Sequence, residues 1–387
     1  MGDIYAESVS HTHVDAALGA ASSGDTVHVP DGESDWNGSS VTIPENVDVI
    51  GNGIDSSKLT DPQFTIGKNA RLSAFTIYPL TQQDPVITAS STDHNDFRID
   101  HIKFYNSTTN AMRAIQICGP DDSELCPCGL IDNCSFRNWR IYVRGNLQMY
   151  YDPGYIFLQD TLLGTKYAVY IEDCTFLLTS GYSGGNIIDM DYGGRYVIRY
   201  SAFTDTYPEV HAPSSAVDNE PAQYGSRSFE IYENTFTSTG DKSHWGMGRV
   251  RAGTGVVYNN SFTRTGGGNT FQMIFDYTPE ALGNSGLSYP APFQPGRGRW
   301  PAETPLYNCA VGGEFPDQNL EPVYCWGNTI DSGDWYVLNS QYNLIQADRD
   351  IYFSTEHPSY SAYTYPHPLR SGGTGATDFN QSITLRF

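Results

Sequence analysis

A short pattern of apolar positions recurs along this chain. An apolar residue is followed three positions later by Asn, Cys or another residue, and two positions after that by Phe or Ile. The pattern occurs nine times, at residues 49–54, 72–77, 99–104, 131–136, 171–176, 198–203, 231–236, 257–262 and 325–330. The first eight occurrences begin 23 to 40 residues apart. Repeats of this length indicate the coils of a solenoid.

The residues within each repeat indicate strands. They are β-branched or aromatic, they are bounded by Gly, Asn and Ser, and no helical periodicity separates them. This composition predicts stacked short strands rather than βαβ units. Stacking would place six rings above one another inside the coil, where burial of each stabilises the fold by roughly 1.5–3 kcal/mol. These rings are Phe104, Phe136, Phe176, Phe203, Phe236 and Phe262.

A second column of the repeat is polar or contains cysteine. Asn234, Asn260 and Asn328 share this column, where buried amides could bond the backbone of the next coil as an asparagine ladder. Cys134 and Cys174 occupy it on consecutive coils. They are expected to form a stacked disulfide or, as the alternative, a pair of small buried thiols.

The N-terminal end of the solenoid needs a cover. Thr12 suits a helix N-cap with Asp15 at the third helical position, and apolar residues follow at Val14, Ala17, Leu18 and Ala21. This spacing predicts a short amphipathic cap within residues 10–24. A turn and the first strand follow at residues 23–30.

Two insertions interrupt the coils. Residues 145–166 are rich in Tyr, and residues 278–324 contain eight prolines. A loop of the second size is typical of a functional segment or a packed lid, with a surface excursion as the alternative. We therefore expect one domain with coils at about 25–277 and 323–340, and a C-terminal segment, 341–387, that packs along the solenoid or closes its end.

These features resemble a known architecture. The cap helix, the Gly24-Asp25-Thr26-Val27-x-Val29-Pro30 segment and the Asn-Ser/Thr-Phe coils are similar to the right-handed parallel β-helix of the pectate-lyase-like superfamily, over about residues 10–277. The resemblance implies an all-β solenoid. This superfamily contains polysaccharide lyases, glycoside hydrolases, phage tailspikes and adhesins, so the fold alone does not give the function.

Composition limits the classes of binding partner and the cellular locations that are expected for this chain. The 387 residues include 44 acidic and 22 basic side chains, a formal charge of −22 that repels phosphate backbones and argues against a nucleic-acid partner. No membrane span is expected, because no run of 18 apolar residues occurs. The N-terminus lacks the basic and apolar regions of a signal peptide.

Seven cysteines indicate disulfides rather than a zinc site. Cys126-Pro127-Cys128 is not a CxxC motif, and no His lies at metal-ligand spacing from it. We expect Cys309 and Cys325 to be bonded, which would stabilise the fold by roughly 3 kcal/mol. Disulfides favour an oxidising compartment, so secretion is expected.

A second strand of the coil carries charges at alternate positions. Alternation puts one face of the strand outside the solenoid, and adjacent coils lie about 4.8 Å apart. The outward charges on neighbouring coils therefore fall within one sugar-sized patch, although a cross-strand ladder of ion pairs would give the same pattern. The patch consists of Asp189, Asp191, Glu209, His211, Arg249, Arg251 and Asp276.

One part of this patch resembles lyases. Arg249-Val250-Arg251-Ala252-Gly253, followed by residues 257–262, is similar to the arginine-glycine coil of chondroitinase- and alginate-lyase-type β-helices. The resemblance implies β-elimination, in which a base removes the proton next to a uronate carboxylate and a cation neutralises that carboxylate. The lysine of those enzymes one coil earlier has no match here.

The position of that lysine holds His211, whose ordinary pKa near 6.5 makes it an easier base than arginine. We expect His211 or Arg249 to act as the base and Arg251 to neutralise the carboxylate. Further expected roles are substrate contact for Glu209, Arg195, Tyr192 and Asp276, and calcium binding by Asp189 and Asp191.

Two other functions fit the same residues. Asp189-Met190-Asp191, a His coil and Arg-x-Arg resemble the order of motifs in inverting polygalacturonase-type hydrolases, but the Asp-Asp and Gly-His-Gly elements of those enzymes are absent. The third possibility is a non-enzymatic adhesin, tailspike or filament subunit that holds glycan or a neighbouring subunit through its tyrosine-rich surface. The net charge of −22 counts against an anionic polymer unless calcium or the arginines screen it.

Overall fold

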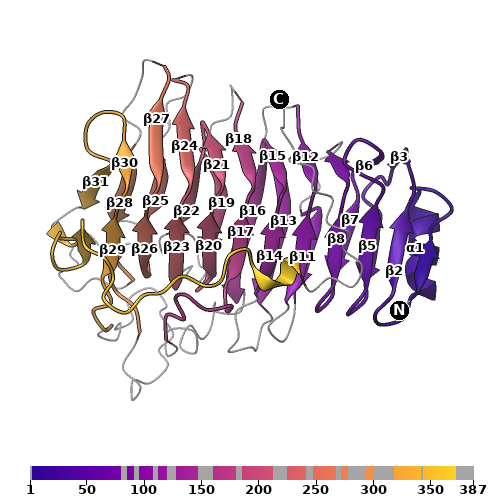
Figure 1. Ribbon diagram of the computed structural model, residues 1–387, viewed down its shortest axis with the longest axis horizontal. Coiled ribbons are helices and arrows are strands. Elements are labelled where there is room, and N and C mark those ends of the chain that lie inside the picture. The colour runs from indigo at the N-terminus through magenta and orange to yellow at the C-terminus, as the bar shows by residue number, and fades with distance from the viewer. Residues whose placement is uncertain are drawn as a thin grey trace, which may run out of the picture.

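The chain folds into a parallel β-helix, as the repeats predict. The computed structural model describes residues 2–79, 85–90, 96–107, 112–119, 128–146, 160–179, 185–211, 225–240, 247–266, 272–277, 293–299, 318–340 and 343–371. Its strands form three parallel sheets of 12, 10 and 10 strands, named here sheets A, B and C. The strands stack side by side along the long axis of the molecule (Figure 1).

After the first strand, successive strands belong to different sheets, so each coil passes through sheets A, B and C in turn. Sheet A consists of β1 (Asp3–Tyr5), β2 (Thr26–Val29), β5 (Asp48–Gly51), β8 (Arg71–Ser73), β11 (Phe97–Asp100), β14 (Gly129–Asp132), β17 (Val169–Glu172), β20 (Arg195–Arg199), β23 (Ser228–Tyr232), β26 (Thr254–Tyr258), β29 (Val323–Trp326) and β32 (Ile351–Phe353). Sheet B consists of β3 (Gly32–Asp35), β6 (Ser57–Thr60), β9 (Thr76–Tyr78), β12 (Lys103–Tyr105), β15 (Ser135–Arg137), β18 (Thr175–Leu177), β21 (Ala202–Thr204), β24 (Thr235–Ser238), β27 (Ser261–Arg264) and β30 (Thr329–Ile330). Sheet C consists of β4 (Ser40–Ile43), β7 (Gln63–Ile66), β10 (Ile87–Ser90), β13 (Met112–Gly119), β16 (Trp139–Asn146), β19 (Asn186–Asp191), β22 (Tyr207–Val210), β25 (Gly248–Val250), β28 (Met273–Tyr277) and β31 (Tyr336–Ser340).

The six predicted phenylalanines form one column inside the coil. Neighbouring rings stack with centroids 4.7–5.1 Å apart and planes within 15° of parallel. All six are buried, and sheet B pairs them in register from β12 to β27. The repeat therefore marks inward positions correctly.

The asparagine ladder is confirmed. Asn234, Asn260 and Asn328 each donate through the side-chain amide to a backbone oxygen of the preceding coil, at 2.8–2.9 Å. The backbone N–H groups of Asn234 and Asn260 bond the amide oxygen of the next asparagine at 3.0–3.1 Å. Polar groups that would be costly to bury are thus satisfied along the turn between sheets A and B.

The predicted disulfides are absent from the described residues. Cys134 and Cys174 lie in the expected column, but both are buried free thiols that donate to backbone oxygens. Cys325 is also a buried free thiol, so its predicted pairing with Cys309 is wrong, and Cys309 itself lies outside the described residues. Cys325 lies on β29 at a position whose side chain points into the core.

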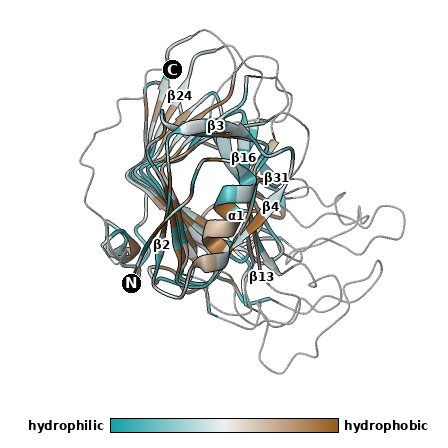
Figure 2. Ribbon diagram, turned by 90° about the vertical axis from the view of Figure 1, so that its right-hand side faces the viewer, coloured by the Kyte–Doolittle hydropathy of each residue, from teal (hydrophilic) through white to brown (hydrophobic). Residues whose placement is uncertain are grey.

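The cap helix is present but begins earlier than predicted. Helix α1 (His11–Ala20) has Ser10 as its N-cap, because the backbone oxygen of Ser10 accepts the first helical hydrogen bond, from Val14. Val14 and Leu18 are buried against the first coil, as the spacing predicts. The helix lies across the N-terminal end of the solenoid (Figure 2). No helix in the described ranges is long and apolar enough to cross a membrane.

The C-terminal segment runs back along the solenoid. From β32 it crosses the outer face of sheet A toward β11 and ends in a short 3-10 helix, η4 (Pro368–Arg370) (Figure 1). Arg199 donates to the backbone oxygens of Tyr363 and Thr364 at 2.8 Å, and Arg370 pairs with Asp173 at 2.5 Å. These contacts hold the described C-terminal residues, up to 371, against the coils. Most of the insertions at 145–166 and 278–324 lies outside the described residues.

A candidate active site on sheet C

Four neighbouring strands of sheet C, β19, β22, β25 and β28, carry or lead into the predicted charged patch. The apolar residues Met190, Val210 and Val250 of β19, β22 and β25 are buried in the core. Strand alternation therefore turns the intervening side chains outward. The register of the sheet aligns Asp189, Glu209 and Arg249 in one row, so the backbone itself brings these groups together.

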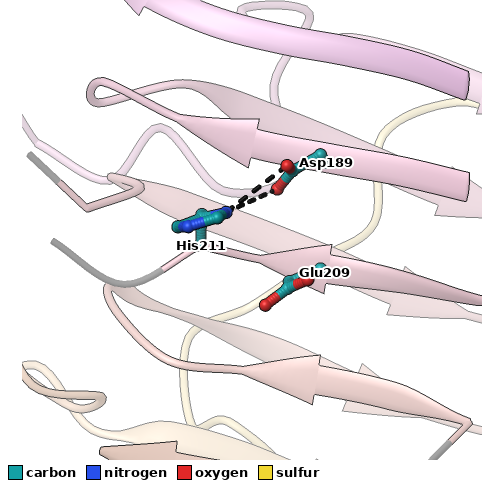
Figure 3. Close-up of side chains that lie close together, drawn as sticks. All are labelled: Asp189, Glu209 and His211. Carbon is teal, nitrogen blue, oxygen red and sulfur yellow. Dashed lines mark hydrogen bonds and ion pairs between the residues drawn. The ribbon is translucent and has the colours of Figure 1, made fainter. Parts of the chain in front are cut away.

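His211 and Asp189 form the centre of the patch. Nδ1 of His211 lies 3.0 Å and 3.3 Å from the two carboxylate oxygens of Asp189 (Figure 3). The backbone N–H of His211 donates to the oxygen of Met190 at 2.8 Å, which fixes the residue just after β22. One ligand atom from each of Asp189, Glu209 and His211 lies within 4.8 Å of the other two.

Asp189 controls the charge of His211. Burial favours the neutral ring, but the nearby Asp189 and Glu209 carboxylates outweigh it and raise the pKa of His211 to about 9. Burial also opposes ionisation of Asp189, but His211, Arg140 and Arg144 outweigh it and lower its pKa. At neutral pH the pair is therefore an imidazolium and a carboxylate. His211 is less ready to act as a base than its ordinary pKa suggested.

Two arginines are held beside this pair. Arg251 Nη1 lies 3.2 Å from Glu209 Oε1, and Arg249 Nη1 lies 3.8 Å from the same oxygen. Arg249 also donates to Asp276 through Nε at 3.0 Å and through Nη2. Asp276 is 1% exposed and accepts a further hydrogen bond from Asn339 of β31 at 3.2 Å. The arginines are thus oriented by carboxylates while their side chains keep 17–18% exposure.

Asp191 has a different environment from Asp189. Burial raises the pKa of Asp191 to about 7, although Arg144, 3.1 Å away, acts in the opposite direction. Tyr192, in the turn after β19, places its ring 5.5 Å from the guanidinium carbon of Arg144. Tyr192 therefore lies beside the patch. Arg195 lies away from the patch, because the turn leads the chain into β20 of sheet A. There Arg195 donates to the Asp160 backbone oxygen at 3.3 Å.

The patch extends further than the sequence analysis recognised. Strand β16 turns Arg140, Tyr142 and Arg144 outward, and Arg113 of β13 lies with its guanidinium carbon 4.8 Å from the Tyr142 ring centre. Arg140 donates to the Tyr142 hydroxyl at 3.1 Å. The alternation Arg140-x-Tyr142-x-Arg144 is visible in the sequence, but an ordinary strand with one face in solvent can show the same alternation without any function.

We call this surface of β13 to β28 the sheet C strip. Its described outward charges are six cationic and four acidic side chains: Arg113, Arg140, Arg144, His211, Arg249, Arg251, Asp189, Asp191, Glu209 and Asp276. With His211 charged and Asp191 partly neutral at pH 7, the strip carries a net positive charge. The strip is thus positive although the whole chain has a formal charge of −22.

The residues expected to hold calcium do not fit that ion. Asp189 pairs with His211, and Asp191 pairs with Arg144. Calcium takes about six to eight oxygen ligands, whereas the third donor beside Asp189 and Glu209 is an imidazole nitrogen.

Comparisons with known proteins find similar solved structures at low sequence identity. No protein-family model and no curated protein sequence matches the chain. Among solved structures, the PL6-family alginate lyase AlyGC matches with a TM-score of 0.44 and 12% identity, over 94% of this chain and 53% of its own. The catalytic unit of a GH87 α-1,3-glucanase from Streptomyces thermodiastaticus matches with a TM-score of 0.37 and 11% identity, over 91% and 66%.

This chain therefore spans about half the length of the alginate lyase and about two-thirds of the glucanase unit. At this identity and overlap, neither likeness assigns an activity to it.

Proposed function

We propose that this chain is a secreted polysaccharide lyase that cleaves a uronate-containing glycan by β-elimination on the sheet C strip. The observation that carries the proposal is the cationic excess of the strip on a chain with a net charge of −22. A neutral glycan gives no electrostatic reason for collecting five arginines on adjacent strands. An acidic glycan does, because guanidinium groups bind carboxylates with two parallel hydrogen bonds.

Arg249 and Arg251 supply the positive charge that β-elimination needs beside the substrate carboxylate. Removing the proton next to a carboxylate develops negative charge on that carboxylate, so preorganised donors beside it lower the barrier. Arg249 and Arg251 are held in place by Glu209 and Asp276 before any substrate arrives. We assign Arg251 and Arg249 to the substrate carboxylate.

His211 is the proposed base once it has lost its proton. The neutral imidazole takes the proton from C5 of the uronate, the electron pair forms the double bond between C4 and C5, and the bond from C4 to the leaving oxygen breaks. The leaving oxygen then needs a proton. Asp191 of β19, whose pKa is raised to about 7, is partly protonated at neutral pH and can supply it. Asp189 holds the imidazole in position.

One observation favours a hydrolase as the second candidate. Asp189 and Asp191 lie on the same face of β19 with their pKa values shifted in opposite directions. A protonated and an ionised carboxyl group side by side are what general acid and base catalysis of glycoside hydrolysis requires.

The product distinguishes the candidates. The chain is incubated with a panel of uronate polymers and neutral glucans, and both the ultraviolet absorbance of 4,5-unsaturated uronate and the number of new reducing ends are measured. A lyase yields both signals on an acidic polymer. Reducing ends without the absorbance indicate the hydrolase, and neither signal on any glycan indicates the adhesin, tailspike or filament function.

A further inference from the structure

We infer that Asp189, Glu209 and His211 form a binding site for a divalent transition-metal ion such as Zn²⁺. Figure 3 shows Asp189 and His211 turned toward each other, with Glu209, the register partner of Asp189 on the adjacent strand of sheet C, below them. Their ligand atoms lie within 4.8 Å of one another, and no other described residues form such a group of three. Two ligands of an ion with bonds of about 2.0–2.2 Å can be at most about 4.4 Å apart, so the observed span needs little adjustment.

The backbone holds these ligands close together without the ion. Asp189 and Glu209 are direct partners in the register of β19 and β22, and His211 follows two residues later on the same face. Both carboxylates are buried, whereas the His211 side chain is 28% exposed. An ion can therefore reach the site from solvent on the side of the imidazole.

The donor set selects the kind of metal. Imidazole with carboxylates suits Zn²⁺, Co²⁺, Ni²⁺ and Mn²⁺, whereas Ca²⁺ prefers oxygen ligands alone. Two carboxylates balance the charge of a divalent ion. Arg251 hydrogen-bonds Glu209 through Oε1, which leaves Oε2 for the ion. Arg251 then acts as an outer partner that orients a metal-binding carboxylate.

The effect of the ion on activity rests on the proposed lyase function. A metal bound to an imidazole nitrogen competes with proton transfer at His211 and with its contact to Asp189. We therefore expect Zn²⁺ to inhibit cleavage and EDTA to relieve the inhibition. Metal binding itself is independent of what the strip cleaves.

Cobalt binding tests the site directly. Tag-free chain is treated with EDTA, dialysed into metal-free buffer and titrated with Co²⁺ while the visible absorption of the bound ion is recorded. We expect a saturable signal with one Co²⁺ per chain. His211→Ala should abolish the signal or weaken binding by more than the roughly 10–100-fold typical of losing an outer partner. Glu209→Gln, which preserves side-chain size, should weaken it in the same direction.

Two control variants should keep the Co²⁺ signal. Asp191→Asn changes the neighbouring carboxylate that pairs with Arg144. His28→Ala removes an exposed His–Asp pair at 2.8 Å that has no described third donor. Thermal unfolding of each variant verifies that it is folded.

The inference is overturned if the parent gives no saturable signal, if folded His211→Ala retains it, or if Asp191→Asn loses it. Because the titration contains no glycan, cobalt binding without cleavage of any polymer would contradict the lyase alone. Cleavage without cobalt binding would contradict the metal site alone.

Discussion

The protonation state of His211 determines how the rate of cleavage should depend on pH. Its pKa of about 9 means that the neutral form, which is the base, is scarce at pH 7. In the presence of EDTA, the proposed cleavage needs neutral His211 and protonated Asp191, whose pKa is about 7. We therefore expect kcat/KM for an acidic polymer to rise about tenfold per pH unit below pH 7, to stay nearly level between pH 7 and pH 9, and to fall above pH 9. A hydrolase with Asp191 as the acid and Asp189 as the base should show no rise toward pH 7, so a profile without that rise would contradict the role of His211.

Substitution of the same residue gives the size of its contribution. His211→Ala should lower kcat by about 10²–10⁴, the usual contribution of a general base, in a variant that remains folded. The matched control is His28→Ala, because His28 also pairs with an aspartate, Asp3, but lies on β2 of sheet A. Equal kcat values for the two variants would place the base elsewhere.

A buried carboxyl group outside the strip should make stability depend on pH. Glu230 is 2% exposed and accepts hydrogen bonds from Tyr360 Oη at 2.5 Å and the Gly164 N–H at 2.7 Å. Burial outweighs these bonds and raises its pKa to about 7. The native state therefore binds a proton more tightly than the unfolded chain. The stability from this group is fully present below its ordinary pKa, near 4.5, and is lost as the pH rises through 7.

The expected loss is about 3 kcal/mol between pH 4.5 and pH 8. Glu230→Gln, which cannot ionise, should flatten this part of the curve of unfolding free energy against pH. Glu233→Gln changes an exposed glutamate on the neighbouring turn and should leave the slope as it is in the parent. Parallel curves for Glu230→Gln and the parent would show that Glu230 titrates normally in the fold.

At the scale of the strand, the phenylalanine column should be the most sensitive part of the core. Phe236 stacks on Phe203 and Phe262 at 4.8 Å and 5.1 Å, so its loss leaves a cavity between two rigid coils. Phe236→Ala should lower the free energy of unfolding by about 3–5 kcal/mol in denaturant titrations. Thr235→Ala on the same strand, at an exposed position, should change it by less than about 0.5 kcal/mol. Similar losses in both variants would contradict the register.

The inward positions of the repeat could be predicted because burial constrains them in every coil. A phenylalanine or asparagine that stacks on the same residue type of the next coil requires that type at the equivalent position of each coil. The repeated residue is therefore visible as a pattern in the sequence. Cysteine gives no such information, because the column that holds Cys134 and Cys174 accepts free thiols as well as a bond. The sequence could therefore predict the column that holds these two cysteines, but not whether they are bonded.

The outward positions were only partly predictable. Alternation identifies which side chains of β19, β22 and β25 face solvent, but the turns decide which sheet a residue joins. Arg195 lies four residues after Asp191 and yet belongs to sheet A, because residues 192–194 carry the chain around the corner. Arg140 and Arg144 were missed for a related reason, since a solvent-facing strand tolerates arginine without any function. Their importance depends on the charges of neighbouring coils.

Across the whole molecule, charge is distributed unevenly, and this should be measurable in substrate binding. Under the proposed function, the cationic strip attracts an acidic polymer against the field of a chain with a net charge of −22. Salt screens the long-range repulsion, with a Debye length of about 10 Å at 0.1 M, but acts less on groups in direct contact. Binding should therefore depend on the local arginines more than on the total charge.

Arg144→Gln tests this separation of local from total charge. Arg144 is part of the strip on β16, two strands from His211, so its loss should raise KM for a uronate polymer about tenfold and change kcat less. Arg264→Gln removes the same charge from β27 of sheet B, where Arg264 pairs with Asp331, and should leave KM near the parent value. The two variants have equal net charge. Equal KM values for them would mean that total charge, rather than the sheet C strip, governs binding of the polymer.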